Sequence, residues 1–62
     1  MKYSELRRML RAQGCYPIRQ GSNHEIWYSP ITERKFPVGR HEAEEVYLRT
    51  LKDIVKQSGI VI

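Results

Sequence analysis

Two histidines are the side chains best suited to chemistry in this 62-residue chain. His24 directly follows the turn-forming segment 21–23, and His41 follows a Gly-Arg pair at 39–40. Because imidazole both takes and gives a proton near neutral pH, either histidine could act as a general acid or base. A polar strand-end residue without a role is the simpler interpretation of each histidine taken alone, so the surroundings must decide.

Other catalytic and metal-binding patterns are missing from the sequence. Cys15, His24 and His41 are nine and seventeen residues apart, without the close ligand pair of a zinc site. Asp53 is the sole aspartate and lies far along the chain, which disfavours a Ser-His-Asp triad. Phosphate-binding glycine loops and calcium loops do not occur either. We therefore expect no bound metal and no organic cofactor.

The charge of the chain suits a polyanionic partner. Eleven Lys and Arg face seven Asp and Glu, which gives a net charge of +4 and a pI near 9.6. Residues 1–41 carry a net +5, whereas residues 42–62 carry −1. A basic excess of this kind is typical of nucleic-acid binding, although a solvated basic surface that only aids solubility has the same composition.

A single well-placed histidine on a basic surface suits RNA in particular. RNA carries its own nucleophile, the 2′-hydroxyl, so that a base which removes its proton starts the cleavage. The oxygen then attacks the adjacent phosphorus and the 5′ oxygen leaves, while nearby cations stabilise the crowded anion. DNA lacks this hydroxyl and would not be cut by this route.

Five elements are predicted to position these side chains. A helix over 4–14 has Ser4 as its N-cap, an apolar face of Leu6, Met9 and Leu10, and Gly14 as its end. Three strands follow at 15–20, 24–29 and 35–38, and Pro17 makes the first of them an edge strand. The second helix is predicted over 46–58. Its predicted apolar residues are Tyr47, Leu51, Ile54 and Val55, and its stop signal is Gly59.

This order predicts an α+β fold, α-β-β-β-α, as one domain over 1–62. We expect a three-stranded antiparallel sheet with two helices on one face, the order of the double-stranded-RNA-binding fold. Buried positions are expected for Cys15 and, as core or platform, for Trp27, and the apolar tail 60–62 should pack. Segment 42–45 is a loop or a first helical turn with a solvated acidic cluster, Glu42, Glu44 and Glu45. With neither a membrane-spanning segment nor a signal peptide, a cytoplasmic protein is expected.

Four segments resemble one protein family in order and spacing. Residues 21–27, Gly-Ser-Asn-His-Glu-Ile-Trp, resemble the Gly-Ser-(His/Asn)-His segment of the HicA-type mRNA-interferase toxins, the YcfA-like family. Segments 4–10, 36–41 and 50–60 are similar to that family's first helix, its strand ending in a basic residue and His, and its closing helix. The resemblance covers nearly the whole chain.

The resemblance implies a double-stranded-RNA-binding-like fold and a toxin that cleaves mRNA. It also implies a HicB-type antitoxin that covers the active surface, and it places the family's catalytic histidine at His24. Asn23 stands where the family often has the first histidine of a doublet. Leu48 and Arg49 replace a frequent Pro-Gly pair, so that the last helix is expected to start earlier.

Further residues are expected to contact the RNA or to complete the reaction. The leaving 5′ oxygen needs an acid, for which Tyr28, Lys35 and His41 are the candidates. A stripe of Arg7, Arg8 and Arg11 could meet RNA or an acidic antitoxin. A non-catalytic RNA-binding module and a pure protein-interaction domain are the alternatives to an enzyme. The expected substrate contacts are Arg19, Gly21, Ser22, Asn23, Lys35, Arg40 and His41.

Overall fold

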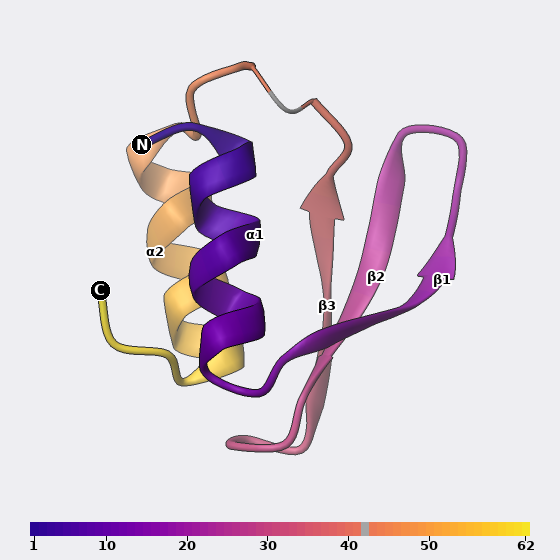
Figure 1. The fold of residues 1–62 in the computed structure, drawn as a ribbon, viewed down its shortest axis with the longest axis vertical. Coiled ribbons are helices and arrows are strands. Elements are labelled where there is room, and N and C mark those ends of the chain that lie inside the picture. Colours follow the sequence, from indigo (N-terminus) through magenta and orange to yellow (C-terminus); the bar gives the residue numbers. More distant parts are fainter. Residues whose placement is uncertain (42) are drawn as a thin grey trace.

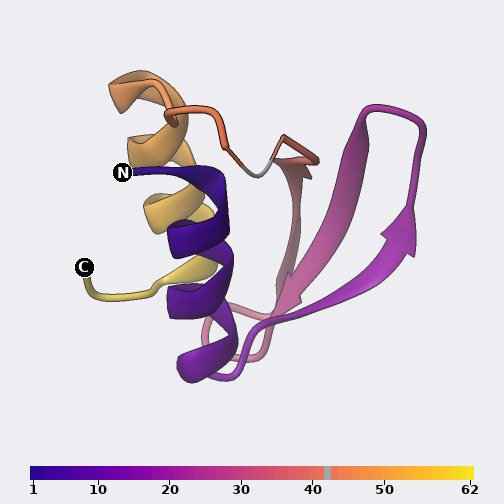
Figure 2. The same ribbon diagram turned by 45° about the horizontal axis from the view of Figure 1, so that its top comes forward.

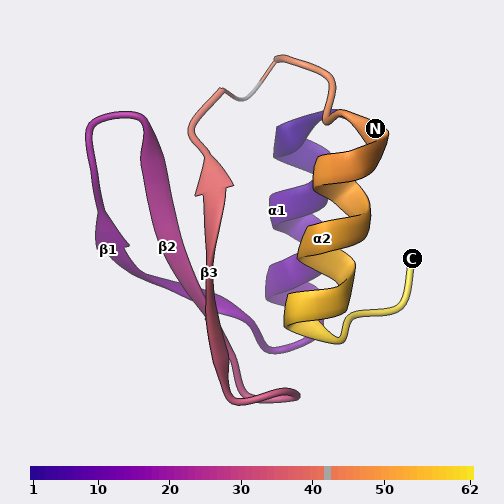
Figure 3. The same cartoon turned by 180° about the vertical axis from the view of Figure 1, so that it is seen from behind.

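The computed structural model describes residues 1–41 and 43–62 and has two helices and three strands (Figure 1). The strands form one antiparallel sheet in the order β1-β2-β3, and both helices lie on the same side of it (Figures 1 and 3). The predicted α-β-β-β-α order and α+β class are therefore confirmed. The elements are α1 (Tyr3–Ala12), β1 (Tyr16–Gln20), β2 (His24–Ser29), β3 (Arg34–Gly39) and α2 (Leu48–Ser58).

The core lies between the helices and one face of the sheet. Side chains alternate along a strand, and Trp27, Phe36 and Val38 are the buried residues that face the helices. The expected burial of Cys15 and the core role of Trp27 are both confirmed. The buried hydrophobic residues are Leu6, Leu10, Cys15, Trp27, Phe36, Val38, Val46, Ile54 and Ile60.

The start of α1 differs from the prediction. Ser4 is not the N-cap: the helix already includes Tyr3, and the capping position is Lys2, without a side-chain hydrogen bond. The chain start instead pairs with the segment before α2, since Tyr3 N–H donates to the Glu44 carbonyl at 3.0 Å. This tertiary hydrogen bond takes one of the free helix amides, so a local cap at Ser4 is not required.

The start of α2 also differs. The prediction of a helix from Val46 is wrong, because α2 begins at Leu48. The earlier start relative to the family stays a prediction. Val46 N–H donates to the Met1 carbonyl at 2.9 Å, and its side chain enters the core, which holds this stretch extended. Tyr47 is the N-cap and is 79 % exposed, so its placement on the apolar face was wrong as well. Segment 43–45 is not helical, and Glu42 of the acidic cluster lies outside the described residues.

An exposed ion pair ties the same two segments together. The Met1 α-amino group donates to Glu45 Oε2 at 2.8 Å. This hydrogen bond and the attraction of the opposite charges raise the pKa of the α-amino group above 8.0. The same contact lowers the pKa of the Glu45 carboxyl below 4.5. The start of α1 and the approach to α2 therefore form one connected unit.

Both helices end as predicted, and the end of α2 meets the β2–β3 turn. Gly14 (φ +98°) and Gly59 (φ +73°) adopt the left-handed conformation that terminates α1 and α2. The buried Ser29 hydroxyl donates to the Ser58 carbonyl, and the Thr32 hydroxyl donates to the Gln57 carbonyl. These bonds anchor the β2–β3 turn, residues 30–33, to the last turn of α2.

The edges of the sheet are β1 and β3, and each carries a proline. Pro17 lies opposite Trp27, and the pairing shifts between Pro17 and Arg19 in a bulge. Pro37 lies opposite Ile26 on the other side. The edge position predicted for the first strand is therefore confirmed.

The C-terminal tail packs only in part. Ile60 is buried, whereas Val61 and Ile62 are exposed. The Gln13 side-chain amide holds the tail through its two hydrogen bonds to the Val61 backbone, at 2.8 and 2.9 Å. Neither described helix has the length and apolar character needed to cross a bilayer.

Candidate active site

His24 begins β2 and its side chain is exposed. The Gly21 N–H donates to the His24 carbonyl at 2.7 Å, which closes the β1–β2 turn and fixes the backbone that carries the imidazole. Strand alternation places His24 with Ile26 and Tyr28 on the face that the helices leave open. The backbone of His24 is thus fixed, and its side chain is accessible to a large substrate.

A shallow hollow of about 330 Å³ lies beside this histidine. Its walls come from the end of β1, the β1–β2 turn and the start of β2. Five of the eight predicted site residues meet here. The lining residues are Arg19, Gly21, Ser22, Asn23, His24 and Ile26.

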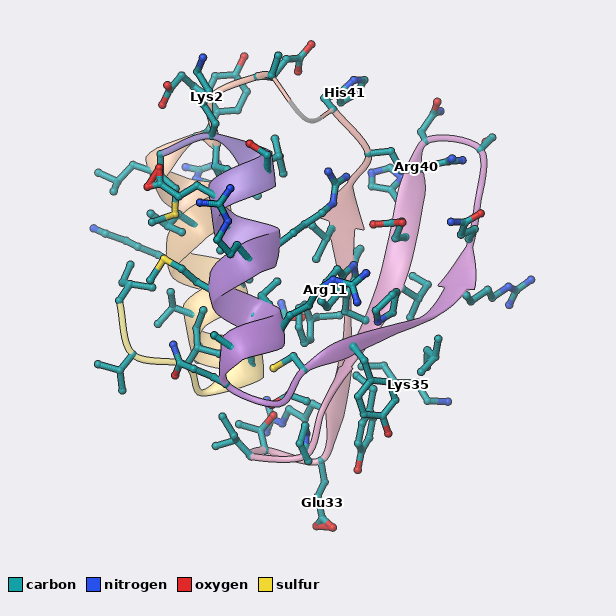
Figure 4. All side chains as sticks on the ribbon, in the orientation of Figure 1. Lys2, Arg11, Glu33, Lys35, Arg40 and His41 are labelled. Atoms are coloured by element: carbon teal, nitrogen blue, oxygen red, sulfur yellow. The ribbon has the colours of Figure 1, made fainter. Side chains whose placement is uncertain are left out.

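Arg40 and His41 lie at the same end of the sheet. His24 pairs across the ladder with Gly39, so both residues follow directly after its strand partner. Arg40 Nη1 donates to the Gly21 carbonyl at 2.9 Å, which fastens the arginine to the turn beside His24. His41 is exposed and its Nδ1 lies 3.8 Å from Glu44 Oε1. Figure 4 shows Arg40 and His41 beyond the end of β3.

Lys35 and Tyr28 lie elsewhere on the sheet. They pair with each other across β2 and β3, four residues along β2 from His24. At roughly 3.3 Å per strand residue, that separation is about 13 Å. Lys35 contributes instead to a different hollow, of about 490 Å³, between β3 and α2, and it lies toward the opposite end in Figure 4. The structure does not bring these two side chains to His24.

Glu25 is a residue whose role the sequence did not reveal. It neighbours His24 but faces the helices, where its Oε1 accepts hydrogen bonds from Trp27 Nε1 and Arg7 Nε, each at 3.2 Å. Arg7 also donates to the Gly39 carbonyl. Arg7 and Glu25 are each 14 % exposed, so this ion pair is largely shielded from water. It links α1, β2 and β3 directly behind His24.

The location of Arg7 explains why the sequence did not predict the Arg7–Glu25 ion pair. The sequence predicts one stripe of Arg7, Arg8 and Arg11, but the structure separates Arg7 from it, because Arg7 is largely buried whereas Arg8 and Arg11 are exposed. The spacing of Arg7 and Arg11, four residues apart on a helix, was the available signal that they share a face. Their partners come from β2 and β3, so no local pattern identifies them.

The described residues hold no group of three or more His, Cys, Asp or Glu side chains arranged to bind a metal ion. The hollow surrounds His24 with guanidinium, amide and hydroxyl groups, from Arg19, Asn23 and Ser22. Such an arrangement supports proton transfer beside a bound phosphate.

One comparison with known proteins identifies a family over nearly the whole chain. The family model described as the HicA toxin of bacterial toxin-antitoxin matches residues 3–60. The searches of curated proteins and of solved structures returned no match. Since the family match spans nearly the whole chain and includes both helices and all three strands, this chain belongs to the HicA toxin family of bacterial toxin–antitoxin systems.

Proposed function

We propose that the protein is a metal-independent endoribonuclease that cleaves mRNA, with His24 as its general acid–base residue. The observation that carries the proposal is the exposed His24, fixed by the Gly21 hydrogen bond and lying in a hollow with Arg19 and Asn23. The family supports it, since HicA toxins are mRNA interferases. A toxin of this class implies an antitoxin partner, and a HicB-type antitoxin that covers this hollow fits that role.

The proposed reaction uses the 2′-hydroxyl of the RNA. His24 removes its proton, O2′ attacks the adjacent phosphorus, and the bond from phosphorus to O5′ breaks. The products are a 2′,3′-cyclic phosphate and a 5′-hydroxyl, after an acid has protonated O5′. Arg19, which lines the hollow of His24, binds the reacting phosphate and stabilises the charge that develops on it, and Arg40, bonded to the Gly21 carbonyl, contacts the RNA beside it.

The acid that protonates the leaving oxygen is assigned to His41. His41 lies two residues beyond the strand partner of His24, at the same end of the sheet, which supports this assignment. Tyr28 and Lys35, about 13 Å along the strand by its rise per residue, are too distant from a phosphodiester held at His24. Gly21, Ser22 and Asn23 contact the RNA, and Lys35 binds it farther along the strand.

The test compares the unmutated protein with His24→Gln and with Tyr28→Phe, a control on the same strand and the same face. His24→Gln is expected to lower the cleavage rate by about 10²–10⁴ without changing the unfolding midpoint, since the side chain is exposed. Tyr28→Phe should cleave normally. Cleavage should persist in EDTA and leave a 2′,3′-cyclic phosphate.

Retained cleavage by a folded His24→Gln protein would contradict the assignment of His24, and loss in EDTA would contradict metal independence. The alternative, a non-catalytic RNA-binding module, uses the same basic surface. It predicts that the unmutated protein binds RNA and leaves it intact.

A further inference from the structure

A second hollow lies on the other side of the β1–β2 hairpin, facing α1. It measures about 280 Å³, and three of its lining residues are arginines from distant parts of the chain. Side-chain alternation separates it from His24, because Gln20 and Glu25 point to the helical face whereas His24 points to the open face. The lining residues of this arginine hollow are Arg7, Arg11, Gln20, Glu25 and Arg40.

The three guanidinium groups are held in place by separate contacts. Arg7 is bound to Glu25 and to the Gly39 carbonyl. Arg40 donates to the Gly21 carbonyl at 2.9 Å. Arg11 lies 5.3 Å from the centroid of the buried Trp27 ring, a cation–π distance, and reaches toward the sheet in Figure 4. Preorganised donors lose less conformational freedom when a ligand binds.

The charges of the arginine hollow do not balance. Three guanidinium groups face one carboxylate, Glu25, which already accepts hydrogen bonds from Arg7 and Trp27. Each guanidinium has five N–H donors, and the hydrogen bonds of Arg7 and Arg40 described above use only some of them. Uncompensated, fixed guanidinium forks are the arrangement that binds the oxygens of a phosphate group.

The basic hollow between β3 and α2 is less organised. It has Arg34, Lys35 and Lys56 with Asp53, which is the same charge balance. Among the described residues, however, no ion pair or side-chain hydrogen bond holds these three cations. It also lies at the far end of the sheet from His24.

Arg40 and Gly21 connect the arginine hollow to the proposed active site. Arg40 lines the arginine hollow and is bonded to Gly21, which lines the hollow of His24. An RNA strand bound at His24, at the tip of the hairpin, therefore reaches the arginine hollow with its neighbouring nucleotides. Such a strand carries a further phosphate on each neighbouring nucleotide, and fixed guanidinium groups match the oxygens of a phosphate, which favours RNA as the ligand.

We propose that Arg7, Arg11 and Arg40 bind a backbone phosphate of the RNA strand next to the one that reacts at His24. This inference rests on the proposed function for its substrate, and it extends the contact surface from the turn to the sheet side of α1. Since a phosphate contact carries no base information, the arginine hollow positions the strand without selecting its sequence.

The test measures the affinity of the complete protein for a short single-stranded 2′-O-methyl RNA, which the proposed reaction cannot cut. Arg11→Gln is compared with Arg8→Gln, a charge-matched control on the outer face of the same helix. Arg11→Gln should weaken binding about tenfold at low salt. The slope of log K against log salt should also become shallower by about 0.7, the value for one phosphate on a single strand. Arg8→Gln should leave the slope unchanged.

A cleavage assay supplies an independent readout. Because the contact holds the strand equally before and during the reaction, Arg11→Gln should raise KM and leave kcat unchanged. Equal slopes for Arg11→Gln and Arg8→Gln would overturn the proposal. Weaker antitoxin binding by Arg11→Gln with unchanged RNA binding would also overturn it, in favour of a protein-docking surface.

Failure of the proposed function gives a different pattern. If the unmutated protein leaves natural RNA intact but its RNA binding still depends on Arg11, the phosphate site is supported and the enzyme is not. If His24→Gln abolishes cleavage while Arg11→Gln changes neither KM nor the salt slope, the enzyme is supported and the phosphate site is not.

Discussion

The two turns of the sheet are built in contrasting ways. The β1–β2 turn, residues 21–23, is exposed and projects away from the helices (Figure 2). The β2–β3 turn, residues 30–33, is tied to α2 through the hydroxyls of Ser29 and Thr32. One turn thus leaves its polar side chains exposed, whereas the Ser29 and Thr32 hydroxyls at the other turn are bonded to the end of α2.

The contrast separates chemistry from stability within one small sheet. A thin core leaves little surplus stability. A chain of this size therefore keeps the contacts that stabilise the fold away from the site that binds its substrate. Changes at the β1–β2 turn should therefore affect activity, and changes at the β2–β3 turn should affect the free energy of unfolding. The predictions below test this division.

The largest effect is expected at Gly59, which packs against the β2–β3 turn. A Cβ there would lie 2.9 Å from methyl carbons of both Ile31 and Thr32, on a backbone with φ +73°. Gly59→Ala should lower the free energy of unfolding by about 2–3 kcal/mol, from strain and overpacking together. Denaturant unfolding measures this change, and RNA cleavage at a temperature where the variant is folded should be unchanged.

Gly14→Ala is the matched control. Gly14 has φ +98°, but its added Cβ would lie 3.6 Å from the Pro30 ring, an ordinary contact. It should cost about 1 kcal/mol, from backbone strain alone. Equal costs for the two substitutions would show that the packing of α2 on the turn contributes nothing.

Smaller effects are expected from one polar side chain in each turn, on cleavage for the β1–β2 turn and on stability for the β2–β3 turn. Asn23→Ala removes an exposed amide of the His24 hollow, and should lower cleavage efficiency by up to about tenfold while the unfolding free energy stays within about 0.5 kcal/mol. Thr32→Val removes the donor to Gln57, and should cost about 1 kcal/mol of stability with normal cleavage. An Asn23→Ala protein that is destabilised yet fully active would reverse the contrast.

The smallest effect concerns the third connection, between β3 and α2, where the Met1–Glu45 ion pair is exposed. The raised pKa of the α-amino group contributes stability below about pH 8.0, which is lost as the pH rises through the folded value. The lowered pKa of Glu45 contributes stability above about pH 4.5, which is lost as the pH falls. Thermal unfolding from pH 4 to 9 should show both losses.

Glu45→Gln isolates this pair from the other titrating groups. The difference in stability between the two proteins should be greatest between about pH 4.5 and 8.0, the range in which both partners are charged. A difference that is independent of pH would mean that the charges do not interact in the folded protein.

The sequence predicted those parts of the fold that local chemistry determines. Periodicity located all five elements, and the range 24–29 of the central strand is the observed one. Gly14 and Gly59 ended the helices as predicted because left-handed backbone is a local property of glycine. The helix starts at Tyr3 and Leu48 were not predictable locally, since hydrogen bonds between the two segments determine them.

The same distinction applies to the candidate site. The turn and His24 are contiguous in sequence, so their meeting with Arg19 at one end of a hairpin could be inferred. The position of Lys35 depends on the cross-strand register, which pairs it with Tyr28 rather than with His24. Likewise, the ion pair of Arg7 and Glu25 joins residues 18 positions apart, and only the packed structure reveals it.

The prolines of the two edge strands bear on how copies of this chain behave at high concentration. An open strand edge is a template on which another chain can add a strand, the first step of many aggregates. Pro17 and Pro37 each remove a backbone donor, and the bulge beside Pro17 distorts the first edge further. Neither edge offers an unbroken ladder, so each edge is a poor template for strand addition by another copy of the chain.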